Sequence, residues 1–233
     1  MTTTFPLHLV ESGVLFQPDR GTPLDIRNVL SHARDYLGLS SGGEKSISDV
    51  EQLGTFINAR ASFVSQTSLY GYVKTRAGTR FPDLFENSVF LESINIAKWQ
   101  IWVACISDLT LYCGGLLYQH TEDSKQVKSI LVTIIDSLIS STGRPDEAGE
   151  AFTASLQTVH SRIESESLAE ITEDDRIFTA SPDALVHWAP IVDELKVLDE
   201  GIVRNSIRFR WQETRRELKR HLNRQAVIAS VAL

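Results

Sequence analysis

The segment FENSVFLESINIAKWQIWVACISDLTLYCGGLLY, residues 85–118, decides the fold. Its second half carries apolar residues on almost every side of a helix, and such a helix must be covered all round by other elements. We therefore predict a central buried helix over about residues 87–118. Asp108 is the single carboxylate in the apolar half. If it is ionised, it must be paired and hydrogen-bonded in the core.

The same segment is long enough to raise the question of a membrane span, which needs about 20 apolar residues. Ser107, Asp108 and Thr110 interrupt the apolar run. Two acidic residues follow it closely, and no basic flank would orient it in a bilayer. We expect a core helix rather than a transmembrane segment.

Helical periodicity recurs along the rest of the chain, and no segment alternates strand with helix. We predict an all-α, single-domain bundle of about six or seven helices around the central one. Residues 1–21 read as an N-terminal arm that precedes a helical domain over residues 22–233. Within that domain, the sequence predicts a first helix at about 22–38 and an acidic surface connection at about 164–180.

Three polar residues occupy positions where helical stripes otherwise carry apolar side chains: Arg60, Asp108 and Asn205. Arg60 falls within the apolar stripe of a helix predicted over residues 48–76. Asn205 interrupts a stripe of the last long helix that we expect to face inward, made of Ile191, Leu195, Leu198, Ile202 and Phe209. We hypothesise that Asp108 faces Arg60, with Asn205 nearby. The set is either a buried structural network or a small-ligand or catalytic site.

Charge is unevenly distributed along a chain whose net charge is −7. That negative balance argues against nonspecific nucleic-acid binding. Residues 145–200 hold 14 acidic and 3 basic side chains, whereas residues 204–224 hold 8 basic and 2 acidic ones. The basic C-terminal helix could therefore dock on the acidic segment, or it could contact a partner or an anionic membrane. Arg208, Arg215 and Arg216 are its candidate contact residues.

A second group of bases, Lys74, Arg76 and Arg80, gathers where the second predicted helix ends. Cations in a last turn complement the helix dipole, which is the simpler interpretation. The alternative is that these side chains bind a phosphate, a lipid headgroup or an acidic partner.

The sequence contains no catalytic or metal-binding motif in the structural setting that the motif requires. Gly38-Leu39-Ser40-Ser41-Gly42 matches G-x-S-x-G, but that motif requires a preceding strand and a sheet, so we interpret it as a hinge. No Glu-x-x-His occurs, and no histidine pair has helical ligand spacing. Cys105 and Cys113 are about 12 Å apart along a helix, too far for a disulfide. We expect no metal, no cofactor, and buried thiols in a reducing compartment.

Residues 60–113 resemble a family of small helical alphaproteobacterial proteins of unsettled biochemistry, some of which are labelled as esterases. The resemblance is carried chiefly by YGYVKTRAGTRFP (residues 70–82) and SINIAKWQ (residues 93–100). It implies a bacterial cytoplasmic protein and assigns no residue roles.

The functional expectation is a non-enzymatic cytoplasmic helical protein that acts through protein–protein contacts. No signal peptide is visible at the N-terminus. Two alternatives stay open. One is a small-molecule binder or esterase-like hydrolase with a site near Asp108. The other is a peripheral binder of anionic membranes through the basic C-terminal helix. The sequence names no protein partner and is compatible with a homo-oligomer.

Overall fold

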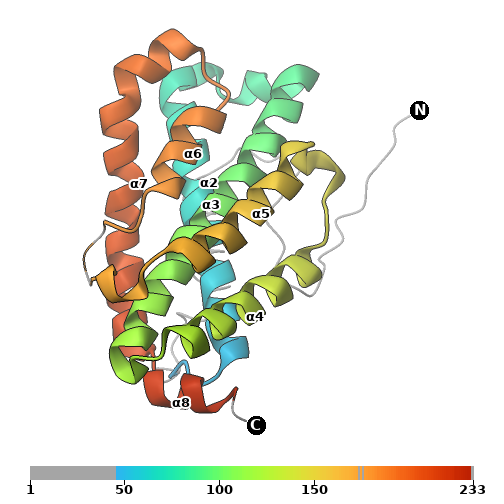
Figure 1. Ribbon diagram of the computed structural model, residues 1–233. Coiled ribbons are helices and arrows are strands. Elements are labelled where there is room, and N and C mark those ends of the chain that lie inside the picture. Colours follow the sequence, from blue (N-terminus) through green and yellow to red (C-terminus); the bar gives the residue numbers. More distant parts are fainter. Residues whose placement is uncertain (1–45, 173, 175, 232–233) are drawn as a thin grey trace. The chain divides into compact units, whose positions relative to one another are not determined.

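The computed structural model describes residues 46–172, 174 and 176–231. The predicted arm, the helix predicted at about 22–38 and the Gly38–Gly42 motif lie outside the described residues. The described part contains seven α-helices and four short 3-10 helices, with one isolated β-bridge and no strand (Figure 1). The prediction of an all-α bundle is confirmed.

The helices follow one another with short connections. The α-helices are α2 (Val50–Ala77), α3 (Ser88–Thr121), α4 (Ser124–Thr142), α5 (Ala151–Ser165), α6 (Ala180–Trp188), α7 (Asp193–His221) and α8 (Arg224–Ala229). The 3-10 helices are η1 (Gly78–Arg80), η2 (Pro82–Glu86), η3 (Asp146–Ala148) and η4 (Leu168–Glu170).

Helix α3 is the central element, and α2, α4, α5 and α6 pack around it (Figure 1). Its residues 105–117 are buried without exception. Asn87 caps its start, because the side-chain oxygen accepts hydrogen bonds from the Val89 and Phe90 N–H groups at 2.9 and 3.1 Å. By length and composition, α3 alone among the described helices could cross a membrane, but 89% of its most apolar window is buried within the protein. The described residues thus contain no clear transmembrane segment.

Two consecutive glycines let η4 approach α3 closely. A Cβ atom added to Gly115 would lie 2.5 Å from Cγ2 of Ile171, which directly follows η4. One added to Gly114 would lie 2.6 Å from Leu131 Cδ1 of α4 and 3.1 Å from Leu168 Cδ2 of η4. No other residue leaves that space, so Gly114 and Gly115 set the distance from α3 to α4 and to the connection that precedes α6.

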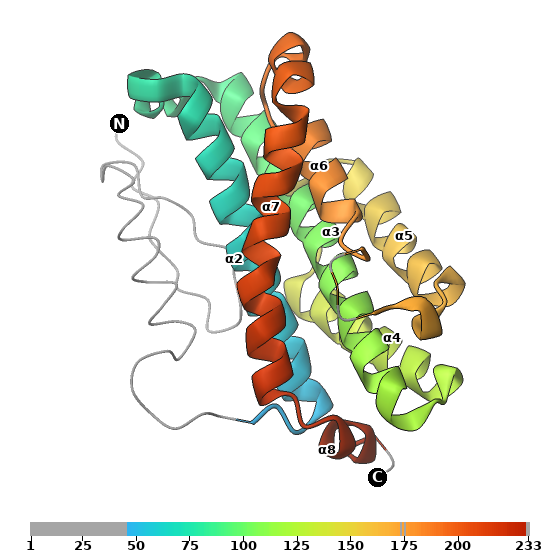
Figure 2. The same cartoon turned by 90° about the vertical axis from the view of Figure 1, so that its left-hand side faces the viewer.

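Helices α2 and α7 lie side by side (Figure 2). The bridge between Ile47 and Leu222 joins their ends: the Ile47 N–H donates to the His221 carbonyl at 2.8 Å, and the Asn223 N–H donates to the Ile47 carbonyl at 2.9 Å. The start of the described chain is thereby fixed to the C-terminal end of α7.

The predicted inward face of α7 is wrong. Leu198, Ile202 and Phe209 are 76%, 76% and 71% exposed. The buried residues of this helix are Asp199, Val203, Ile207, Trp211, Thr214 and Leu218. Residues along a helix are about 100° apart, so this buried stripe and the exposed one lie on opposite sides. Apolar periodicity marks both sides and does not by itself say which one faces the core.

Candidate functional site

The fully buried Asp108 carboxylate lies at the centre of a polar network. Arg162 of α5 donates from Nη1 to Asp108 Oδ1 at 2.9 Å, and from the same nitrogen to the Ser107 hydroxyl at 2.7 Å. The side chain of Asp108 is 0% exposed and that of Arg162 is 16% exposed. The guanidinium therefore neutralises the only carboxylate in the apolar half of α3.

Asp108 also acts as the cap of α6. The Ala180 N–H donates to Asp108 Oδ1 at 3.2 Å, and the Ser181 N–H donates to Oδ2 at 2.7 Å. Thr179, which occupies the N-cap position of α6, provides no side-chain hydrogen bond. A carboxylate at a helix start satisfies free N–H groups and interacts favourably with the helix dipole. A residue 72 positions away in sequence thus replaces the local cap.

Ser181 extends the network to α7. Trp211 donates from Nε1 to the Ser181 hydroxyl at 3.0 Å, and its ring lies 4.9 Å from the ring of Phe178. Phe178, Ser181 and Trp211 are all fully buried. The network therefore ties α3, α5, α6 and α7 together at one point of the core.

Burial raises the pKa of Asp108 above the ordinary carboxyl value, while Arg162 and the Ser181 hydrogen bonds oppose that shift. Burial and the nearby Asp108 charge also raise the pKa of the Cys105 thiol. Asp108 is 0% exposed and both of its oxygens accept hydrogen bonds from the protein, so the carboxylate is closed to a ligand that approaches from solvent. The arrangement has the chemistry of a structural ion pair.

The hypothesised pairing of Arg60 with Asp108 is wrong. Arg60 forms an ion pair with Glu217 of α7, and their side chains are 8% and 16% exposed. Its guanidinium also lies 5.5 Å from the ring of Phe56. Asn205 belongs to neither pair, because it sits on the exposed face of α7. The three residues grouped from sequence therefore occupy three separate environments.

Sequence reasoning missed a second buried network around Lys98. Lys98 Nζ lies 2.5 Å from Glu147 Oε1, and Trp99 donates from Nε1 to the same oxygen at 3.1 Å. Burial, with a smaller contribution from the Glu147 charge, raises the pKa of Tyr70 to about 12. Lys98 lies on α3, and a lysine in a helix predicted to be buried is a signal in the sequence that an acidic partner is needed. Its partner Glu147 comes from η3, in the acidic region of the sequence.

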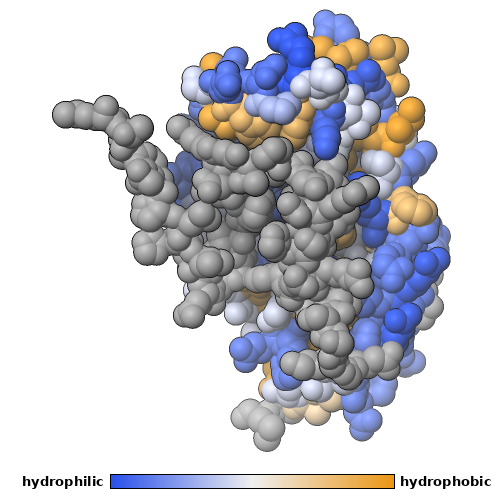
Figure 3. All heavy atoms as spheres, turned by 180° about the vertical axis from the view of Figure 1, so that it is seen from behind, coloured by the Kyte–Doolittle hydropathy of each residue, from blue (hydrophilic) through white to orange (hydrophobic). Residues whose placement is uncertain are grey.

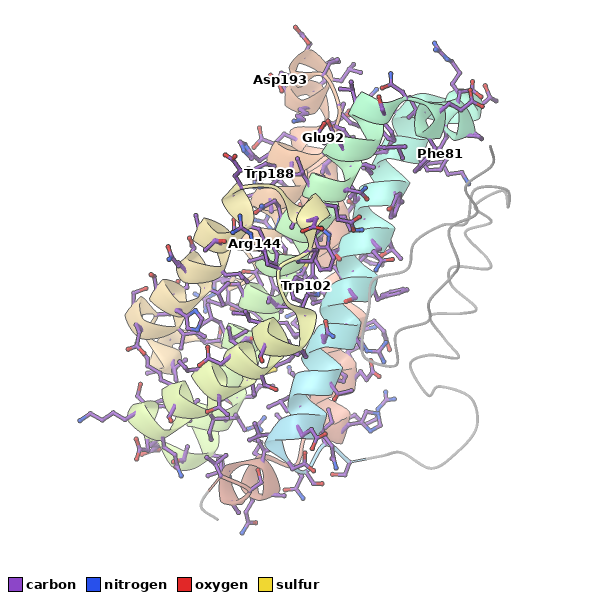
Figure 4. All side chains as sticks on the ribbon, turned by 90° about the vertical axis from the view of Figure 1, so that its right-hand side faces the viewer. Phe81, Glu92, Trp102, Arg144, Trp188 and Asp193 are labelled. Carbon is purple, nitrogen blue, oxygen red and sulfur yellow. The ribbon has the colours of Figure 1, made fainter. Side chains whose placement is uncertain are left out.

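Trp102 marks the core side of this second region (Figure 4). Its ring is 1% exposed and lies 5.7 Å from the ring of Trp99 in an edge-to-face arrangement. Its Nε1 donates to Asn58 Oδ1 of α2 at 3.1 Å. Aromatic packing and a satisfied indole N–H fill this part of the interface between α2 and α3, so it forms a closed contact.

The basic corner at the end of α2 is partly committed to internal contacts. Arg76 forms a bidentate ion pair with Asp199 of α7, and the Tyr72 hydroxyl donates to Asp199 Oδ2 at 3.0 Å. Arg80 is exposed and Lys74 is half-buried. Arg76 therefore joins α2 to α7 although its side chain is 34% exposed, and Arg80 is the other exposed base of this group.

One contact between the basic C-terminal helix and the acidic segment is an ion pair of Arg204. Arg204 pairs with Asp183 of α6 and donates to Glu200 at 2.7 Å. Arg216 is exposed, and Arg208 and Arg215 are half-buried. The buried stripe of α7 adds Val203, Ile207, Trp211 and Leu218 to the core.

No group of three or more potential metal-ligating side chains occurs in the described part of the chain. Comparison with known protein families, with curated proteins and with solved structures found no match.

Proposed function

We propose that this protein is a non-enzymatic, cytoplasmic helical protein that acts through protein–protein contacts, and that the outer face of α7 is its contact surface. We define the outer face as Leu198, Ile202, Asn205 and Phe209. Its apolar members are more than 70% exposed. This exposure is the observation that carries the proposal.

Exposed apolar side chains are concentrated on this helix. Among the described residues, four of the seven large hydrophobic side chains recorded as exposed lie on α7: Val197, Leu198, Ile202 and Phe209. Single exposed hydrophobic residues need no explanation, but a run along one helix is typical of an interaction surface. In Figure 3, apolar residues appear along the upper right edge, where α7 lies, above a mostly hydrophilic lower part.

The hydrolase alternative has less support. Asp108, around which a ligand site was hypothesised, accepts hydrogen bonds from three protein donors and is fully buried. The described free thiols are buried as well, which agrees with an intracellular protein whose cysteines serve packing rather than chemistry.

Site-specific photo-crosslinking in the native cells tests the proposal. A photoreactive residue at position 205 lies on the outer face and leaves its apolar members intact. The matched control places the same residue at Val197, which is 75% exposed on the same helix but off the outer face. We expect a discrete crosslinked protein from position 205 and a much weaker one from position 197.

Equal crosslinking from the two positions, or none from position 205, would contradict the proposal. Mass spectrometry of the product also separates an external partner from residues 1–45 of the same chain. A crosslink to those residues alone would mean that the outer face is an internal contact.

A further inference from the structure

The outer face of α7 has the spacing of a coiled-coil seam. Leu198, Ile202, Asn205 and Phe209 follow one another at intervals of four, three and four residues. Apolar residues at alternating intervals of three and four form the a and d positions of a heptad. Leu195, half-buried at the start of α7, continues the same pattern. A second helix can therefore pack along this seam by inserting its side chains between the seam residues of α7.

Charge along α7 changes sign from one end to the other. Residues 193–206 hold four acidic and two basic side chains, whereas residues 207–221 hold two glutamates and six arginine or lysine side chains. Asp193, at the outer end of the helix in Figure 4, has a side chain that is 93% exposed. An identical helix packed in parallel would bring like charges together, whereas an antiparallel one brings acidic residues against basic ones.

These two observations make the outer face complementary to itself about a two-fold axis, as an isologous dimer interface must be. An antiparallel pair places each a residue opposite a d residue of its partner. One register sets Leu198 opposite Phe209 of the second copy, and Ile202 opposite Asn205 of the second copy. In this register Asn205 faces an isoleucine rather than a second asparagine, so the polar position lowers the stability of the pair.

Resting on the proposed function, we infer that the partner of the outer face is a second copy of this chain, bound through an antiparallel pair of α7 helices. The apolar residues of each outer face are then covered. The acidic first turn of each α7 lies near the basic second half of the other α7.

Sedimentation equilibrium of the full chain, from low to high micromolar concentration, tests dimer formation. We expect a dimer for the wild-type chain. The double variant Ile202→Glu/Phe209→Glu puts four carboxylates into the seam and should raise the dimer dissociation constant at least about 30-fold. The control Val197→Glu alters an equally exposed residue of α7 off the seam and should leave the dimer intact. Circular dichroism verifies that all variants keep their helix content.

Cysteine crosslinking tests the orientation. The native Cys105 and Cys113 are buried, so introduced thiols report on the surface. A mixture of Leu198→Cys and Phe209→Cys chains should form a disulfide-linked heterodimer, whereas Leu198→Cys alone should not crosslink. Efficient crosslinking of Leu198→Cys alone would overturn the antiparallel arrangement.

A wild-type chain that stays monomeric at high micromolar concentration would overturn the inference. The proposed function fails separately, since it requires crosslinking from position 205 to a second protein molecule, either another copy of this chain or a different protein. Two outcomes would contradict both proposals. Crosslinks only to residues 1–45 of the same chain would mean that the outer face is an internal contact. Flotation with phosphatidylserine vesicles that is lost in Ile202→Glu/Phe209→Glu and retained in Val197→Glu would mean that the outer face binds membranes.

Discussion

Arg162 on α5 and Asp108 on α3 form an ion pair of 2.9 Å whose carboxylate also caps α6. The carboxylate therefore does two things at once: it satisfies a guanidinium from one helix and two N–H groups from another. Because Ser181 receives the Trp211 indole N–H, the same point also fixes the position of α7. One buried carboxylate thus helps to fix the relative positions of four helices: α3, α5, α6 and α7.

Removal of that charge should destabilise the protein strongly. Asp108→Ala leaves Arg162 unpaired in the core and the start of α6 without its cap, so we expect a loss of about 3–5 kcal/mol in the free energy of unfolding. Urea denaturation measures it. Asp136→Ala is the control, because Asp136 also pairs with a base, His160 at 2.8 Å, but is 62% exposed. It should cost less than about 1 kcal/mol. Equal losses in the two variants would contradict the assigned role of Asp108.

Sequence patterns predicted the helices of this bundle better than the contacts between them. Apolar residues on every side of residues 99–118 left α3 no position other than the centre. The absence of a Cβ at Gly114 and Gly115 permits close neighbours, which the structure identifies as Leu131 of α4, Leu168 of η4 and Ile171. These inferences need only local information, since burial on all sides and the absence of a Cβ are properties of the segment itself.

Which charged residues pair, and which side of a helix faces the core, depend on the whole fold. The predictions for Asp108 and for α7 were wrong in these two respects. Several bases could have neutralised Asp108, and periodicity gave no reason to prefer Arg162 over Arg60. One signal was present: Arg162 is adjacent to Ile163 and three residues after Val159, both buried, so it lies at the edge of the inward stripe of α5. For α7, the residues Ile202 and Phe209 formed as regular a stripe as Ile207 and Trp211.

The close contact at Gly115 predicts a sharp difference between two glycine substitutions on neighbouring helices. In Gly115→Ala the new Cβ would lie 2.7 Å from Ile171 Cβ and 3.1 Å from its carbonyl oxygen, so the connection before α6 must shift. We expect a loss of about 1–3 kcal/mol from this overpacking. Thermal and urea denaturation measure the change.

Gly54→Ala is the matched control for that variant. Gly54 is also buried in a helix, but the added Cβ would lie 3.6 Å from Ile134 Cγ2, an ordinary contact. Replacement of a helical glycine by alanine should then be neutral or stabilise the protein by about 0.5–1 kcal/mol. The close-packing account fails if Gly54→Ala is as destabilising as Gly115→Ala.

Both cysteines should be inert in the folded protein. Burial raises the pKa values of the Cys105 and Cys113 thiols above their ordinary value, which removes the reactive thiolate. A chromogenic disulfide reagent at mildly alkaline pH should therefore label neither thiol in native protein and both in urea. Rapid labelling of native protein would show that the core around α3 opens to solvent.

Tyr70 should make the stability of the protein fall at high pH. Burial and the Glu147 charge raise its pKa from 10.0 to about 12 in the folded state. Between these values the unfolded chain releases the phenol proton while the folded protein keeps it. The stability linked to Tyr70 is therefore fully present below pH 10.0 and is lost as pH rises toward the folded pKa, by at most about 2.7 kcal/mol.

The difference between wild-type and Tyr70→Phe protein isolates this contribution, because phenylalanine keeps the ring and removes the ionising group. Urea denaturation at increasing pH should show the wild-type chain losing more stability than Tyr70→Phe above pH 10.0. In native protein at that pH, their absorbance difference should lack a tyrosinate band from Tyr70. A half-developed tyrosinate band there would mean that Tyr70 is solvated and that the Lys98–Glu147 region is open to water.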